Sequence, residues 1–184
     1  MLYLATGIAM FCLVHLFPTA VRLRQSLISA VGENMYKAIF SIITVTGIVL
    51  IVMGYPQVEY NLVFSPPEWG RAVTASLMLI SLVFFAAANM PGNLKRFTRH
   101  PMLWGLVIWA IAHLFSNGDR AAVVLFVSLG LFALVAMLSA NLRGAKKQKQ
   151  KVPYTKDIMA IFAGIIAYMI LVFVHPYLFG VAVL

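Results

Sequence analysis

The chain has 184 residues, of which 62% are hydrophobic and 10% are charged, and its mean hydropathy is +0.95. These values exclude an ordinary soluble globular protein and indicate an integral membrane protein. The formal net charge is +9, with 14 Lys and Arg against 5 Asp and Glu. In a soluble protein this excess would suggest nucleic acid. Here the basic residues stand between long apolar segments, so we expect membrane lipids as partners and no nucleic acid.

Six apolar segments have about the length of 17–25 residues that a membrane-spanning helix needs. They predict an all-α, polytopic integral membrane bundle of about six transmembrane helices, forming a single domain over residues 1–184. The fourth segment is short and is joined tightly to the fifth, which predicts an antiparallel hairpin. The segments are 2–18, 37–55, 72–90, 102–117, 120–140 and 157–183.

The basic residues predict the orientation of this bundle. Only Arg71 and Arg120 follow the second and fourth spans, so 12 of the 14 basic residues fall on the other side, many of them in a basic loop at 141–156. The positive-inside rule places that side in the cytoplasm and both termini on the outer side of the membrane. We expect the basic loop to be a solvated connector that touches anionic lipid. We also expect the first and fourth spans to be in contact.

Two histidines, His15 and His113, lie within apolar spans, and an ionisable group inside a membrane is a functional candidate by default. The two spans run in opposite directions, and side chains lean towards the N-terminus of their own helix, so the imidazoles lean towards the same depth. Facing imidazoles can hold a haem iron or another transition metal. The alternative is a pair of hydrogen-bonded packing histidines.

The fourth span also carries residues that suit a flat ligand. Gly105 and Trp109 precede His113 by eight and four residues, so all three lie along one helix face. Pro101 suits the first turn of this helix. Gly118 is expected to end it as a C′ glycine, and Asp119 to cap the next helix.

The remaining histidines and the cysteine have milder interpretations. His175 stands near the outer end of the last span, where an interfacial anchoring role is expected. His100 could cap the fourth helix, or contact acidic groups of a ligand together with Arg96 and Arg99. Cys12 lies three residues before His15, as a buried small hydrophobe or an alternative soft ligand.

Several kinds of chemistry lack the residues that they need. The chain contains no G-x-S-x-G, H-E-x-x-H or P-loop motif, and its single cysteine excludes an intramolecular disulfide and the C-x-x-C-H attachment of c-type haem. The spans carry no buried carboxylate and no evident inverted repeat, which argues against a transporter.

Four segments of the chain resemble the NnrU family of bacterial membrane proteins, and the resemblance covers most of residues 1–140. Members of that family are associated with denitrification and nitric oxide metabolism. The resemblance implies a bacterial inner membrane, so that the predicted outer side, with both termini, is the periplasm. The family is similar to 15-cis-zeta-carotene isomerase, an integral membrane enzyme that uses b-type haem with histidine ligation. The segments are Gly32-Glu-Asn-Met-Tyr-Lys-Ala-Ile-Phe-Ser41, Pro91-Gly92, Arg99-His-Pro-Met-Leu-Trp-Gly105 and Trp109-Ala-Ile-Ala-His-Leu-Phe-Ser-Asn-Gly-Asp119.

This resemblance implies b-type haem, with nitric oxide or a polyene as its ligand. The positions of the haem ligands then fall on His15 and His113, while Gly105 would give the ring room and Trp109 would pack beside it. The arginines at the cytoplasmic end would bind the carboxylates of the haem; they are Arg22, Arg24, Arg96 and Arg99.

Two alternatives remain open on the sequence. The motif Arg99-His100-Pro101 with Gly105 is similar to the R-H-P-x-Y-x-G signature of integral membrane methyltransferases that use S-adenosylmethionine. However, Leu103 replaces the expected aromatic residue and no later Glu-Glu motif follows. The third reading is a non-enzymatic membrane subunit, in which haem serves as a redox or gas-sensing element.

Overall fold

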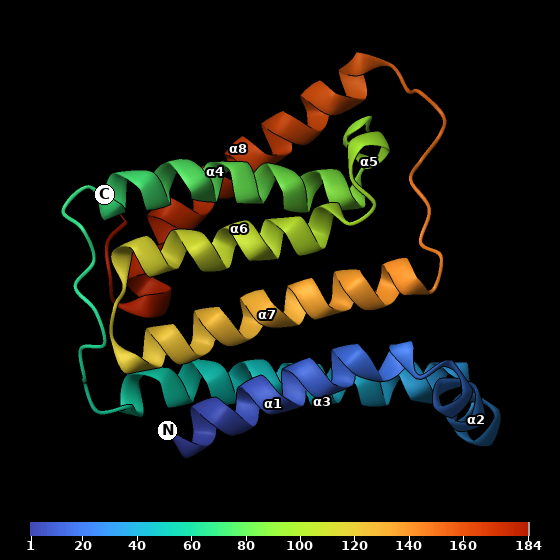
Figure 1. Cartoon of the computed structure of the whole chain (residues 1–184), viewed down its shortest axis with the longest axis horizontal. Coiled ribbons are helices and arrows are strands. Elements are labelled where there is room, and N and C mark those ends of the chain that lie inside the picture. The colour runs from blue at the N-terminus through green and yellow to red at the C-terminus, as the bar shows by residue number, and fades with distance from the viewer. Residues whose placement is uncertain (184) are drawn as a thin grey trace.

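The computed structural model describes residues 1–183, and Leu184 lies outside the described residues. Six long helices alternate in direction along the chain (Figure 1), which confirms the predicted all-helical, multi-pass bundle. They are α1 (Leu2–Leu16), α3 (Glu33–Gly54), α4 (Gly70–Asn89), α6 (Pro101–Ser116), α7 (Arg120–Leu142) and α8 (Tyr154–Phe179).

Five segments are long and apolar enough to cross a membrane, one of them formed by α1 together with the 3-10 turn that extends it to Thr19, and α6 is the exception. With 16 residues it is about 24 Å long, less than the roughly 30 Å of a bilayer hydrocarbon core. It packs between α4 and α7, and its pairing with α7 is the predicted antiparallel hairpin. The neighbours of α6 therefore fix its depth.

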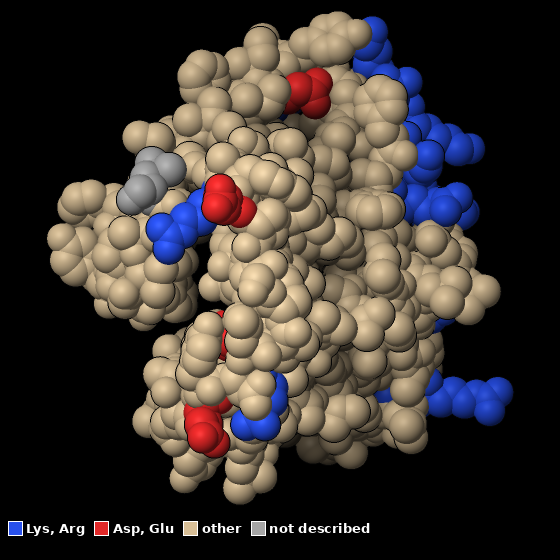
Figure 2. All heavy atoms as spheres, turned by 60° about the vertical axis from the view of Figure 1, so that its left-hand side comes forward, with Lys and Arg blue, Asp and Glu red and all other residues tan. Residues whose placement is uncertain are grey.

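The two ends of the bundle differ in charge. The N- and C-termini lie at one end in Figure 1, together with the loop that joins α3 to α4. The other end, called here the basic end, holds 12 of the 14 basic residues, in the connections and in adjoining helix ends such as those with Lys37 of α3 and Lys156 of α8. Figure 2 shows most Lys and Arg side chains along one edge of the molecule. The alternation predicted from charge is thus present, and its orientation in the membrane stays a prediction.

The helices pack as a chain of neighbours, in the order α3, α1, α7, α6, α4 and α8. The predicted packing of the first span on the fourth is not a main contact of the bundle, because α1 packs chiefly on α3, α6 packs chiefly on α4, and α7 contacts both α1 and α6. Small residues permit the close pairs. A Cβ atom on Gly7 would lie 2.7 Å from the carbonyl oxygen of Gly47, and one on Gly164 would lie 2.7 Å from the Cα atom of Val83.

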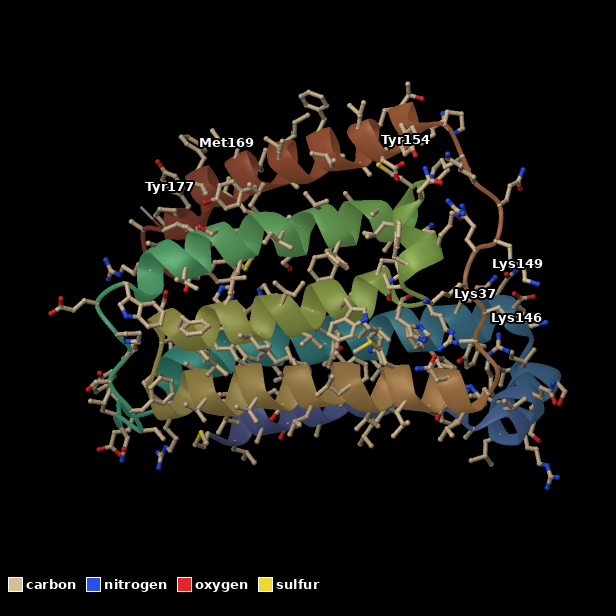
Figure 3. All side chains as sticks on the ribbon, turned by 45° about the horizontal axis from the view of Figure 1, so that its top comes forward. Lys37, Lys146, Lys149, Tyr154, Met169 and Tyr177 are labelled. Atoms are coloured by element: carbon tan, nitrogen blue, oxygen red, sulfur yellow. The ribbon has the colours of Figure 1, made fainter. Side chains whose placement is uncertain are left out.

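The outward faces of the helices are apolar, as lipid contact requires. On α8, Met169 and Tyr177 are 62% and 79% exposed, and Figure 3 shows both pointing away from the bundle. Small residues mark its packed face, since Ala160 and Gly164 are the buried residues of α8.

A short helix that the sequence analysis missed, α2 (Val21–Val31), lies at the basic end (Figure 1). Leu23, Leu27 and Val31 recur every four residues, while arginine and serine occupy other faces. Leu23 is 62% exposed. A helix with one apolar and one polar face suits the membrane surface, and this spacing was the signal that could have revealed it.

At the opposite end, residues 58–69 fold against the turn between α6 and α7. The backbone N–H groups of Val63 and Phe64 donate to the carbonyl of Gly118 at 2.9 and 3.2 Å, and Arg120 donates to Asn61 at 2.8 Å. A Cβ atom on Gly118 would lie 1.9 Å from the carbonyl oxygen of Phe64. Gly118 does follow the C-cap residue of α6, as predicted, but its φ is not positive, so the close approach of Phe64 and not a left-handed turn requires glycine here.

The predicted start of α7 is confirmed. Asp119 is the N-cap, and its carboxylate accepts a hydrogen bond from the N–H group of Ala122 at 3.1 Å. One backbone N–H group in the first turn of α7 thereby has its hydrogen-bond partner within the chain.

Candidate functional site

His15 lies in the last turn of α1, half-buried in an aromatic surrounding. Its Nδ1 atom is 2.8 Å from the carbonyl oxygen of Phe11, and the two rings stack with centroids 4.1 Å apart. The ring also meets Phe40 of α3 and Phe132 of α7, at 5.1 and 6.1 Å between centroids. When Nδ1–H donates to the carbonyl, Nε2 keeps its lone pair for a metal.

His113 repeats this arrangement in the last turn of α6. Its Nδ1 atom is 2.9 Å from the carbonyl oxygen of Trp109, which fixes the same tautomer. The ring stacks on Phe126 of α7 at 4.6 Å between centroids, and Trp109 lies beside it at 5.0 Å. Trp109 therefore packs against the imidazole, and its predicted place beside a haem ring stays a prediction.

Both imidazoles lean towards the N-terminus of their own helix, as predicted, because each bonds a carbonyl four residues earlier. Each imidazole has its own aromatic partner on α7. His113 stacks on Phe126 and His15 meets Phe132, which lies six residues further along the chain and about 9 Å along the helix axis. Among the described residues, the ring contacts of each imidazole are with these neighbours and not with the other imidazole.

The surroundings decide which metal chemistry suits these histidines. Phe126 and Phe132 are 5% and 8% exposed, and Cys12 packs against the core cluster of α1, α6 and α7 that contains Phe126. Within residues 1–183, no group of three or more His, Cys, Asp or Glu could hold a metal ion. A tetrahedral zinc site is therefore not supported. Haem brings its own four nitrogen ligands, so isolated imidazoles in apolar surroundings fit its donor chemistry.

Gly105 does not face the histidines. A Cβ atom there would lie 3.1 Å from the carbonyl oxygen of Ser81 and 3.3 Å from the Cβ atom of Phe84, both on α4. The hydroxyl of Ser81 in turn donates to the carbonyl of Gly105 at 2.7 Å. The missing side chain makes room for α4 in this structure.

Arg96 and Arg99 lie at the basic end, on α5 (Leu94–Phe97) and just before α6. Arg99 donates through Nη1 to Oδ1 of Asn141 at 3.1 Å. His113 stands about 18 Å along α6 from Pro101, so the structure does not bring these arginines to it.

The arginine that an aromatic series connects to His15 is Arg24, on α2. Its guanidinium carbon lies 5.6 Å from the ring centroid of Tyr36. The Tyr36 ring is 6.5 Å from Phe40, which in turn meets His15. A cavity of about 400 Å³ is lined by Arg24, Tyr36, Lys37 and Phe40. The Tyr36 hydroxyl is buried without a hydrogen-bond partner among the described residues. The sequence analysis did not single out Tyr36, because one tyrosine in an apolar helix forms no recognisable motif.

The other two histidines occupy the two ends of the bundle. His175 lies near the opposite end, as expected, with Nδ1 2.7 Å from the carbonyl oxygen of Val181. His100 is the N-cap residue of α6, but its side chain does not cap the helix. Its Nε2 atom lies 3.0 Å from Oδ1 of Asn141.

A second cavity, of about 500 Å³, opens at the basic end beside the Arg99-His100-Pro101 motif. Its polar lining comes from the α5 region, the start of α6 and the basic loop. These residues are Lys95, Arg99, His100, Lys146, Lys147 and Gln148. The lining contains no carboxylate, so the cavity is electropositive.

Comparison with known proteins gives a family match over nearly the whole chain. The model of the NnrU protein family matches residues 3–183. The match therefore includes α8, beyond the region of residues 1–140 in which the sequence resemblance is strongest. No curated protein and no solved structure matches the chain.

Proposed function

The chain belongs to the NnrU protein family, and we propose that it acts in the membrane as a b-type haem protein with His15 and His113 as the iron ligands. The supporting observation is the shared state of these imidazoles. Each is half-buried among aromatic rings, with Nδ1 held by a carbonyl and Nε2 left for a metal. Attachment is non-covalent, because Cys12 alone cannot form two thioether links.

The residues of the chain would orient the imidazoles and exclude water. The carbonyls of Phe11 and Trp109 set the tautomers, and stacking on Phe126 limits rotation of the His113 ring. Holding one iron with both imidazoles would require their contacts with Phe126 and Phe132 to rearrange. Bound haem would supply electron transfer or the binding of a small ligand such as nitric oxide, or act on a polyene double bond.

The visible spectrum of the purified protein, expressed with ample haem, tests this proposal. We expect a Soret band in the wild type and a low-spin spectrum. His15→Ala should keep haem with a high-spin spectrum, and His113→Ala should lose most of it. His175→Ala is the matched control and should leave the band unchanged. Absence of a Soret band in the wild type, or its loss only in the control, contradicts the proposal.

The family association with denitrification makes nitric oxide one candidate ligand, and the similarity to an isomerase makes a polyene the other. Addition of nitric oxide to the reduced protein should shift the Soret band if the protein is a sensor or redox subunit. Conversion of a cis polyene to its trans isomer, monitored by chromatography, would instead make it an enzyme.

The methyltransferase alternative is less well supported by the geometry. The Arg99-His100-Pro101 motif does line a cavity, as a cofactor site would require. However, that cavity lacks a carboxylate, which could hold ribose hydroxyls or offset the positive sulfonium of S-adenosylmethionine. Titration of the protein with S-adenosylmethionine should therefore give no binding heat.

A further inference from the structure

The basic loop between α7 and α8 is mostly exposed, as expected of a solvated connector, but it is also docked on the protein by hydrogen bonds. The N–H group of Gln148 donates to the carbonyl of Lys95 at 3.1 Å. Asn93 and Val152 exchange two hydrogen bonds, at 2.8 and 3.0 Å. Asn93, only 5% exposed, is in turn held by the carboxylate of Asp157 through two hydrogen bonds of 2.6 Å. The loop is therefore fixed at both its centre and its end.

This docking brings cations from separate parts of the sequence to one cavity. Lys146 and Lys147 come from the loop, Lys95 from α5, and Arg99 with His100 from the start of α6. Figure 3 shows Lys146 at the same end of the bundle as Lys37. Like charges repel, so a cluster without a lining carboxylate indicates an anionic ligand.

The arginine is positioned by a polar neighbour. Oδ1 of Asn141 accepts from Nη1 of Arg99 at 3.1 Å and lies 3.0 Å from Nε2 of His100. One amide oxygen thus holds both groups at the edge of the cavity. The guanidinium keeps other N–H groups free to bind two oxygen atoms of a phosphate.

One wall of the same cavity is apolar. It is formed by Ala88 at the end of α4 and by Met102 and Leu103 in the first turn of α6. Met102 is 47% exposed on the outer face of a membrane helix. A cationic rim beside an apolar wall matches a phosphate group that carries a hydrocarbon tail.

We propose that this cavity is a binding site for a phosphate group, supplied by an anionic phospholipid headgroup at the basic end. Arg99 and Lys95 contact the phosphate from the helices, and Lys146 and Lys147 contact it from the docked loop. The proposal is independent of haem binding, because the cavity lies at the basic end and its lining does not include His15 or His113.

Two double variants of equal charge separate this site from a diffuse basic surface. Lys146→Gln with Lys147→Gln removes two cations from the cavity lining. Lys149→Gln with Lys151→Gln removes two cations from the same loop that do not line it; Lys151 lies instead over the ring of Tyr154 at 4.9 Å. The full chain is purified in detergent with phosphatidylglycerol and phosphatidylcholine, and bound lipid is measured by native mass spectrometry.

We expect the wild type to retain one phosphatidylglycerol in preference to phosphatidylcholine. The first variant should bind it at least about tenfold more weakly, since each lysine near an anionic headgroup contributes roughly fivefold. The second variant should stay within about threefold of the wild type. Equal loss in both variants, or no loss in the first, overturns the proposal.

Further arms identify the source of the phosphate and guard against misfolding. Inorganic phosphate is added to the lipid-bound protein; if it displaces the lipid from the wild type, the site takes free phosphate and the lipid assignment is overturned. Arg99→Gln removes a cation from the helix side of the cavity without changing the loop. It should lower phosphatidylglycerol retention at least about fivefold with unchanged helix content by circular dichroism, and full retention by this variant also overturns the proposal.

Discussion

Replacement of Gly118 by alanine tests how firmly the loop of residues 58–69 holds the end of α6. The new Cβ atom would lie 1.9 Å from the carbonyl oxygen of Phe64 and 3.0 Å from its carbonyl carbon. A carbon and a carbonyl oxygen ordinarily stay at least about 3.3 Å apart. The loop must therefore move away from the turn by roughly 1.4 Å.

That displacement breaks three backbone hydrogen bonds, which join Val63 and Phe64 to Gly118 and Arg120 to Asn61. At about 1 kcal/mol for each bond, the free energy of unfolding falls by about 3 kcal/mol. For a chain of this size, a loss of about 3 kcal/mol lowers the midpoint of thermal unfolding by roughly 6–12 °C. Circular dichroism of the protein in detergent measures this midpoint.

Gly130→Ala is the matched control, because it adds the same methyl group to the same helical hairpin. A Cβ atom at Gly130 meets only the Cβ atom of Ala110, at 3.3 Å. The higher helix propensity of alanine, worth up to about 1 kcal/mol, offsets this mild contact. We expect the control to unfold within about 3 °C of the wild type. Equal midpoints for Gly118→Ala and Gly130→Ala would refute the packing of the loop on the turn.

Two further predictions concern the basic end and the orientation of the chain. Asp157→Ala should lower the free energy of unfolding by about 2–4 kcal/mol, because it removes two charge-assisted hydrogen bonds to the buried Asn93. The released loop should be cleaved faster by a protease within residues 143–153. An unchanged cleavage rate counts against the docked loop. Reporter fusions after Asn141 and after residue 183 should report the cytoplasm and the periplasm respectively, and a result with both on one side contradicts the predicted topology.

The sequence predicts the spans well because a membrane forces every backbone polar group into a helix and every lipid-facing side chain to be apolar. Each predicted segment thus corresponds to one observed helix. The order of neighbours is not encoded in that pattern, and this is why α7 was not expected between α1 and α6. Gly118 shows the same limit, since its need for a missing side chain arises from Phe64, more than 50 residues earlier.

In the candidate site too, features set by local contacts were predictable and features set by distant residues were not. The tautomer and lean of His15 and His113 were predictable, because both depend on the carbonyl four residues earlier in the same helix. The contact of Gly105 with α4 was not predictable, because the spacing between a glycine and His113 within one helix does not show which neighbouring helix the glycine meets. Docking of the basic loop depends on Asn93 and Asp157, which are 64 residues apart.

The supports of the two histidines explain why their substitution should have unequal effects. α6 is anchored to α4 by buried hydroxyl groups: Thr74 donates to the carbonyl of Ala112 at 2.6 Å, one residue from His113, and Ser81 donates to Gly105. These bonds persist in a membrane because water cannot replace them. His15, in contrast, stands just before the 3-10 turn at Phe17–Thr19, where the chain leaves the α-helix at Pro18. A helix end next to a proline moves more easily than a helix held from both sides. His113 is therefore the ligand that we expect to remain on the iron, and His15 the one that exchanges.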